Sequence, residues 1–176
     1  MGGHVFVDES KSRGYLLVAS VVLPGELGTS RRAIRDLMLP GQKRLHMKSE
    51  GMAQRKRILA ALAELGLTAT IYRAGGEYKT DLARREACLA RLVVDILQSG
   101  HTFLCLESDE TLDARDRRQL AALIRPDGTT AALRYRHERA AQEPLLAVPD
   151  AIGWAWARGG DWRRRARALV NGVVDV

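Results

Sequence analysis

The chain lacks the features of a disulfide-stabilised, membrane-spanning or secreted protein. It has only two cysteines in 176 residues, Cys88 and Cys105, and neither has a Cys or His at ligand spacing. We therefore expect two buried free thiols rather than a disulfide or a metal site. No apolar run approaches the roughly 18 residues of a spanning helix, and the N-terminus has no charged-then-apolar leader. These absences predict a cytoplasmic protein without a membrane partner.

Several common catalytic motifs are also missing. The sequence contains no Gly-rich phosphate loop ending in Lys-Ser or Lys-Thr, no Gly-x-Ser-x-Gly elbow and no pair of His residues at helical spacing. The four His residues, at positions 4, 46, 101 and 137, are scattered. Nucleotide-binding P-loops, serine-hydrolase elbows and helical zinc sites therefore have no support.

The chain does have an apolar core and an excess of positive charge. Its 46% apolar content predicts one ordinary domain over residues 1–176. The net charge of +7 favours a polyanionic partner. Solvated helix faces are an ordinary explanation for any one basic residue, but two clusters favour nucleic acid. The clusters are Arg31, Arg32, Arg35, Lys43, Arg44, Lys48, Arg55, Lys56 and Arg57, and then Arg158, Arg163, Arg164, Arg165 and Arg167.

Hydrophobic periodicity predicts an α/β arrangement. Strand patterns cover residues 3–8, 15–23, 67–72, 102–107 and 131–137, and residues 44–48 could add a short edge strand. Helical patterns cover about 29–39, 52–65, 82–97, 112–124 and a closing helix that starts near Pro144 or Pro149 and ends at Gly159. A hairpin followed by alternating helices and strands predicts a mixed sheet with helices on both faces.

Three acidic residues stand where these elements begin or end. Asp8 ends the first strand, Asp109 follows the strand at 102–107, and Asp150 opens the closing helix. Each has an ordinary explanation: Asp8 belongs to the mouth of a hairpin, Asp109 is a loop or N-cap residue, and Asp150 complements a helix dipole. Strand tips and helix starts of an α/β fold tend, however, to share one edge of the sheet. The sequence therefore predicts that the three carboxylates converge.

Converging carboxylates suit a particular chemistry. Mg²⁺ prefers oxygen ligands and keeps several waters, so three or four carboxylates suffice to hold it. Two such ions about 4 Å apart clamp a phosphodiester, one activating water and the other stabilising the leaving oxygen. A metal-dependent enzyme acting on phosphate is the expected function.

At these residues the chain resembles the ribonuclease H-like superfamily. More narrowly, it resembles a bacterial and phage family described as a domain of unknown function. That family has an initial Asp-Glu-Ser-Gly, a short His-containing segment, a mid-chain strand ending in an acid, and a late Gln-x-x-Asp helix. The corresponding segments here are Val7-Asp8-Glu9-Ser10, Leu45-His46-Met47-Lys48, Leu106-Glu107-Ser108-Asp109 and Leu145 to Ile152. Lys11, Ala147 and Pro149 depart from the family pattern.

The resemblance implies an α/β fold with a ribonuclease H-like mixed five-stranded sheet and helices on both faces. It also implies that the first and fourth strands are adjacent and that Mg²⁺ or Mn²⁺ is the cofactor. The implied site has catalytic residues Asp8, Asp109, Asp150 and Glu9, metal ligands Asp8, Asp109, Asp150 and Glu107, and substrate-binding residues His46, Lys48 and Arg55. The fourth carboxylate ligand stays open among Glu9, Glu50 and Glu107, and an ordinary edge-strand role is the alternative for His46.

The expected function is that of a divalent-metal-dependent nuclease acting on DNA, RNA or a hybrid. Two alternatives keep the same fold and the same basic surface. One is a non-catalytic nucleic-acid-binding or regulatory module, and the other is an interaction subunit of a phage-defence or mobile-element system. Metal-dependent cleavage distinguishes the first reading from both alternatives.

Overall fold

A single mixed sheet organises the protein. The computed structural model describes residues 2–124 and 133–176. Within them, six strands lie in the order β5-β4-β1-β2-β3-β6. The strands are β1 (His4–Ser10), β2 (Tyr15–Val22), β3 (Ala69–Ala74), β4 (Phe103–Glu107), β5 (Arg134–Glu138) and β6 (Val170–Asp175). β2 runs antiparallel to β1 and β3, whereas β1–β4, β4–β5 and β3–β6 are parallel pairs.

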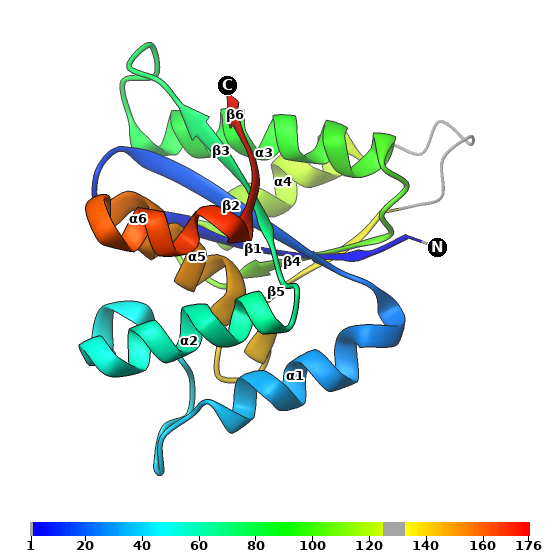
Figure 1. Cartoon of the computed structure of the whole chain (residues 1–176). Helices are drawn as coiled ribbons and strands as arrows, with labels where there is room; N and C mark the ends of the chain where they lie inside the picture. The colour runs from blue at the N-terminus through cyan, green and yellow to red at the C-terminus, as the bar shows by residue number, and fades with distance from the viewer. Residues whose placement is uncertain (1, 125–132) are drawn as a thin grey trace.

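Helices cover both faces of this sheet (Figure 1). One face carries α3 (Asp81–Gln98) and α4 (Asp113–Leu123), and the other carries α1 (Leu27–Asp36), α2 (Met52–Glu64), α5 (Ala147–Arg158) and α6 (Gly160–Ala166). Short 3-10 turns are η1 (Pro24–Glu26), η2 (Met47–Ser49), η3 (Pro144–Leu146) and η4 (Arg167–Leu169). No helix among the described residues is long and apolar enough to span a membrane.

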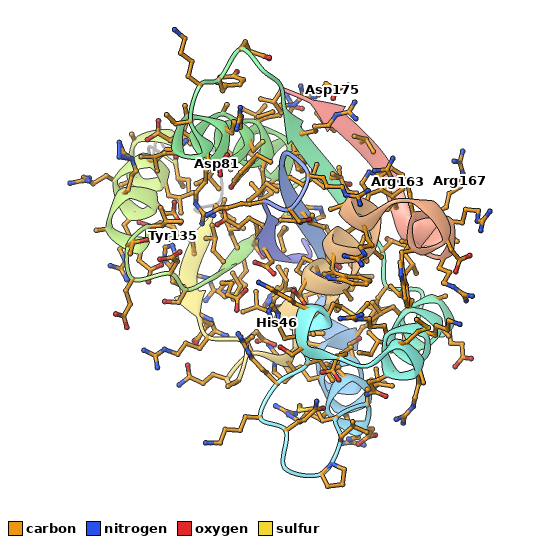
Figure 2. All side chains as sticks on the ribbon, turned by 90° about the vertical axis from the view of Figure 1, so that its left-hand side faces the viewer. His46, Asp81, Tyr135, Arg163, Arg167 and Asp175 are labelled. Atoms are coloured by element: carbon orange, nitrogen blue, oxygen red, sulfur yellow. The ribbon has the colours of Figure 1, made fainter. Side chains whose placement is uncertain are left out.

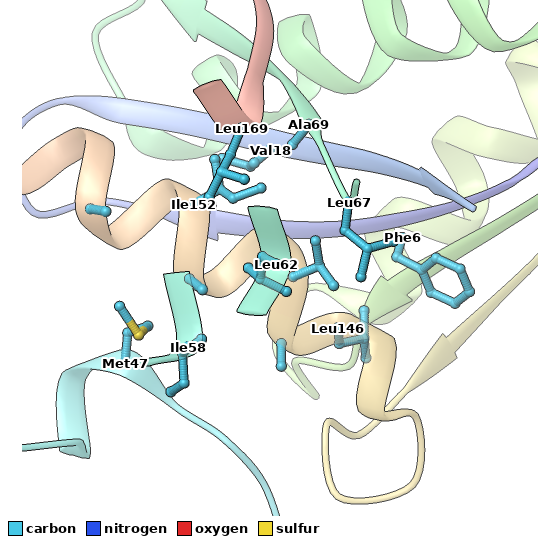
Figure 3. Close-up of a cluster of buried hydrophobic side chains, with 14 of the residues drawn as sticks. Phe6, Val18, Met47, Ile58, Leu62, Leu67, Ala69, Leu146, Ile152 and Leu169 are labelled. Atoms are coloured by element: carbon cyan, nitrogen blue, oxygen red, sulfur yellow. The ribbon is translucent and has the colours of Figure 1, made fainter. Parts of the chain in front are cut away.

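Side-chain alternation along the strands separates two cores. On β1, Phe6 packs with α2 and α5, whereas Val5 and Val7 pack with α3. Figure 3 shows the first core, in which Phe6, Val18 and Ile152 lie among apolar side chains of several elements. The site described below lies on the α5 side of the sheet, so this alternation decides which strand residues can reach it.

The α/β class, the mixed sheet and its helical layers are confirmed, and so is the predicted adjacency of the first and fourth strands. The expected count of five strands is wrong, because β6 adds a sixth strand beside β3. Asn171 and Gly172 give β6 low intrinsic strand propensity, and only its pairing with β3 defines it. The fifth strand was expected over residues 131–137, of which 131 and 132 lie outside the described residues.

The edge strand expected at residues 44–48 is also wrong. This segment forms a loop that leads into η2, and both Leu45 and Met47 are buried. The backbone N–H of Met47 donates to Asp150 and is therefore not available to a sheet partner. The prediction for the cysteines holds, since Cys88 and Cys105 are buried free thiols.

The close approach of α5 to β2 yields a first prediction. A Cβ added to Gly153 would lie 2.9 Å from Cγ2 of Val18, a buried β-branched side chain with little freedom to move. We expect Gly153→Ala to lower the free energy of unfolding by about 1–3 kcal/mol through overpacking. Urea denaturation measures this. The control is Gly28→Ala in α1, where an added Cβ meets nothing within 4 Å, and equal effects of the two substitutions would contradict the prediction.

Candidate active site

The pairing of β1 with β4 sets Asp8 beside Glu107. Val7 is the register partner of Leu106 in this parallel pair, so the next residues of the two strands stand at the same level. Phe6 and Cys105 belong to the core on the α5 side. Because successive side chains alternate between faces, Asp8 and Glu107 also point to that side. Two carboxylates nearly 100 residues apart in sequence are thereby neighbours.

A third carboxylate comes from the first turn of α5. Asp150 is half-buried, and the residues that follow it, Ala151 and Ile152, anchor the helix in the core beneath the sheet. The pKa of Asp8 lies well above its ordinary value because the group is desolvated, because Glu107 and Asp150 carry nearby negative charge, and because Glu107 shares a hydrogen bond with it. The three acidic side chains therefore form one electrostatically coupled cluster, which we call the acidic cluster.

The acidic cluster is wider than a site for a single ion. Among residues 2–124 and 133–176, the groups of three ligand atoms within 4.8 Å of one another do not include Asp8, Glu107 and Asp150 together. Ligands of a two-ion site span a larger distance, since the ions themselves stand about 4 Å apart. As they stand, these three carboxylates therefore do not form a one-ion cage by themselves.

The loop before α2 holds the acidic cluster in place. One oxygen of Asp150 accepts a 2.8 Å hydrogen bond from the Met47 backbone N–H, and the other lies 3.2 Å from Nδ1 of His46. This contact with Asp150 raises the pKa of His46. Arg44 pairs with Glu107 at 3.2 Å from the same loop. His46 lies near the centre of the face turned toward the viewer in Figure 2.

Lys48 and Arg55, the other two residues expected to bind substrate, lie on different sides of the loop before α2. Lys48 is exposed and lines a groove beside Asp150. Arg55 donates to the backbone carbonyls of Met47 and Lys48, at 2.8 and 3.0 Å, so it supports the loop from behind. Its guanidinium also lies 4.5 Å from the ring centre of Trp154.

Asp109 does not join the acidic cluster. Its side chain is exposed and accepts hydrogen bonds from the backbone N–H and the hydroxyl of Thr111, which lower its pKa. β4 ends at Glu107, and beyond Ser108 the chain turns toward α4. Asp109 therefore stands at the rim of the hollow that Asp8 and Glu107 line. Of the two acids near the end of β4, Glu107 is the one brought to Asp8.

Glu9 points to the opposite face of β1. Its carboxylate accepts hydrogen bonds from the Tyr15 hydroxyl at 2.6 Å and from Arg85 at 2.8 Å, and it pairs with Lys11 at 2.7 Å. These contacts occupy its oxygens, so Glu9 belongs to the support behind the site and not to the acidic cluster.

The arrangement of strands and helices has a known structural counterpart. A solved structure of ribonuclease HII from Archaeoglobus fulgidus, in complex with PCNA, matches this chain with a TM-score of 0.59 at 14% identity. The match covers 95% of this chain and 77% of the ribonuclease HII chain. The fold is ribonuclease H-like. No family model matches the sequence, and neither does any curated protein, so the narrower family resemblance stays a prediction.

Behind the acidic cluster lies a buried ion-pair network that the sequence did not predict. Arg85 of α3 binds both oxygens of Asp116, at 3.0 and 2.7 Å, and His137 of β5 lies 3.1 Å from the same carboxylate. A signal was present, because Arg85 stands at helical spacing with the core residues Leu89 and Leu92. An arginine on an apolar stripe indicates a buried partner.

The same network contains three side chains of the types that bind metals. Ligand atoms of Asp113, Asp116 and His137 lie within 4.8 Å of one another. Asp113 already accepts from the Ser108 hydroxyl at 2.7 Å and from the Asp109 backbone N–H at 2.9 Å. The guanidinium of Arg85 occupies both Asp116 oxygens and supplies the positive charge that an ion would bring. We therefore interpret this group as an ion-pair network that fixes the start of α4 to the sheet.

This network predicts a large effect on stability. Arg85→Met would leave the buried carboxylate of Asp116 without its cation, which costs about 3–5 kcal/mol of unfolding free energy. Arg91→Met on the same helix is the matched control, because its ion pair with Asp95 is largely exposed and is worth under about 1 kcal/mol. Chemical denaturation of the two variants checks this, and similar losses would refute the assigned role of Arg85.

A third prediction follows from the raised pKa of Asp8. The raised pKa means that the folded state favours the neutral carboxyl, whereas the unfolded chain ionises near its ordinary pKa of 3.8. The folded state therefore loses stability as the pH rises from 3.8 toward the raised pKa. In metal-free buffer, Asp8→Asn should therefore melt at a higher temperature than the wild type at pH 7, and the difference should shrink toward pH 4. Asp109→Asn should bring no such gain, because the pKa of Asp109 is lowered. Equal melting temperatures of Asp8→Asn and wild type at pH 7 would disprove the coupling.

Proposed function

We propose that this protein is a divalent-metal-dependent nuclease that hydrolyses phosphodiester bonds of nucleic acid. The observation that carries the proposal is the convergence of Asp8 from β1, Glu107 from β4 and Asp150 from α5 on one face of the sheet. The ribonuclease H-like fold supports it, since the solved protein of similar fold is a ribonuclease. The net charge of +7 supports a polyanionic substrate.

The donor set fits Mg²⁺ or Mn²⁺. All three side chains offer hard carboxylate oxygens, and two of them stand on adjacent strands of a rigid sheet. Burial and then repulsion from Glu107 and Asp150 raise the pKa of Asp8, and bound cations relieve such repulsion. When bound, divalent ions would supply Lewis-acid stabilisation of the charge that develops on the phosphodiester. Asp8, Glu107 and Asp150 are the residues proposed to hold them.

The remaining residues orient this site. The backbone N–H of Glu9 donates to Asp8 at 2.7 Å, and that of Met47 donates to Asp150, so two of the three carboxylates are fixed by backbone donors. His46 lies against Asp150, where its imidazole can bind a phosphate oxygen or carry a proton. Lys48 contributes a cation beside the same carboxylate.

Asp109 and Glu9 have different roles from those expected of them as ligands. The Asp109 carboxylate accepts from Thr111 at the rim of the hollow, and the Glu9 carboxylate is held by Arg85 and Tyr15. In this proposal Glu107, one of the two ligands expected near the end of β4, binds metal and Asp109 does not, and Glu9 positions the end of β1.

Cleavage assays test the proposal. Labelled single-stranded, duplex and hybrid oligonucleotides are incubated with the purified protein and Mg²⁺ or Mn²⁺, and EDTA should abolish cutting. Asp8→Asn, Glu107→Gln and Asp150→Asn should each reduce cleavage by about 100-fold or more, because each removes a charge that stabilises the transition state. Asp109→Asn should stay within a few-fold of wild type.

The comparison of Glu107→Gln with Asp109→Asn is the sharpest part of this assay. The two acids are two residues apart, and only Glu107 stands beside Asp8. If Asp109→Asn is the more damaging change, the ligand assignment fails. If the wild type binds nucleic acid in a salt-dependent manner and cuts none of the substrates, the non-catalytic binding module replaces the nuclease.

A further inference from the structure

A groove leads away from the acidic cluster along α5. It is lined at one end by His46 and Asp150 and at the other by Trp154 and Arg158, with Lys48 beside them. Asp150, Trp154 and Arg158 follow one another at intervals of four residues and therefore form one stripe on the helix. A rise of about 1.5 Å per residue places successive members roughly 6 Å apart along the axis. We call this hollow the α5 groove.

The indole of Trp154 is held rigidly in the α5 groove. Arg55, which supports the loop before α2, lies 4.5 Å from the ring centre, and Trp162 of α6 meets the ring edge-on at 5.1 Å and 74°. The side chain is half-buried, and the part that is not covered lines the groove. A fixed aromatic ring at the wall of a polar groove offers a flat surface for stacking.

Two cations line the same groove as this ring. Lys48 and Arg158 are both exposed, and among the described residues neither makes an ion pair. The guanidinium of Arg158 lies 5.9 Å from the ring centre of Trp154. Lys11 also lines the groove, but its ammonium is engaged by Glu9. The groove thus combines one stacking surface with two side chains suited to phosphate.

We propose that the α5 groove binds an unpaired nucleotide of a single-stranded nucleic acid adjoining the phosphodiester at the acidic cluster. Trp154 stacks on the base, and Lys48 and Arg158 contact the backbone phosphates. Bases within a duplex are covered on both faces by their neighbours, so a tryptophan can stack only on a base that is unpaired. The inference rests on the proposed nuclease function and specifies its substrate as single-stranded.

The chain provides a matched control for Trp154. Trp156 lies two residues further along α5, is also half-buried, and also has an arginine over its ring, Arg163 at 5.1 Å. It does not line the α5 groove. Arg163 points outward near the α6 end of the molecule in Figure 2. Removing either tryptophan takes away a similar ring, but only one of them belongs to the groove.

Binding in EDTA tests the inference without cleavage. Fluorescence anisotropy measures the affinity for a labelled oligothymidylate and for a duplex of equal length, with folding of each variant checked by circular dichroism. Trp154→Ala should weaken single-strand binding by about tenfold, the effect of losing one stacked base, whereas Trp156→Ala should change it less than about twofold. The wild type should prefer the single strand.

Arg158→Ala keeps the test decisive if Trp154→Ala does not fold. Removing this exposed side chain should lower the salt dependence of single-strand binding by about one phosphate contact. Arg163→Ala should leave the salt dependence unchanged. Equal effects of Trp154→Ala and Trp156→Ala, or duplex binding as tight as single-strand binding, would overturn the inference.

The two proposals fail separately. If the wild type cleaves nucleic acid but Trp154→Ala binds like Trp156→Ala, the groove assignment is wrong and the nuclease stands. If the wild type binds single strands through Trp154 and never cleaves with Mg²⁺ or Mn²⁺, the nuclease is wrong and the groove is a binding site in its own right.

Discussion

Parallel pairing of β1 with β4 is the constraint on which the candidate site depends. It joins segments nearly 100 residues apart and fixes their register at Val7 and Leu106. The register brings Asp8 level with Glu107, and the pleat turns both toward α5. A shift of one residue would send either carboxylate to the other face of the sheet. The buried apolar residues that precede both acids hold the register, since such a shift would move each of them out of the core in which it packs and into the other.

The same alternation gives adjacent residues of β1 different tasks. Asp8 faces α5 and joins the acidic cluster, whereas Glu9 faces α3 and binds Arg85. Arg85 carries the connection on to Asp116, which lies against His137 of β5. One side of the strand end therefore holds concentrated negative charge, and the other side is neutralised by a buried cation. The second arrangement anchors the backbone on which the first depends.

Helix α5 links the core, the acidic cluster and the groove. Its apolar residues Ala151 and Ile152 pack against the sheet, and the absence of a side chain at Gly153 allows the close approach to Val18. Asp150 and Trp154 stand on the other side of the helix, where they line the α5 groove. A substitution that lifts the helix from the sheet would displace the carboxylate and the stacking ring together.

Local pattern in the sequence determined the α/β class, the main helices and strands, and the candidacy of Asp8 and Asp150, because apolar periodicity and polar residues at element ends are short-range properties. Tertiary packing decided the rest. Which acid of β4 lies beside Asp8 depends on where the strand ends, and Glu107 rather than Asp109 precedes that end. The loop around Met47 forms because Asp150 binds its backbone, and β6 exists because β3 offers an edge. Partners distant in the chain impose these outcomes, and no local window of sequence contains them.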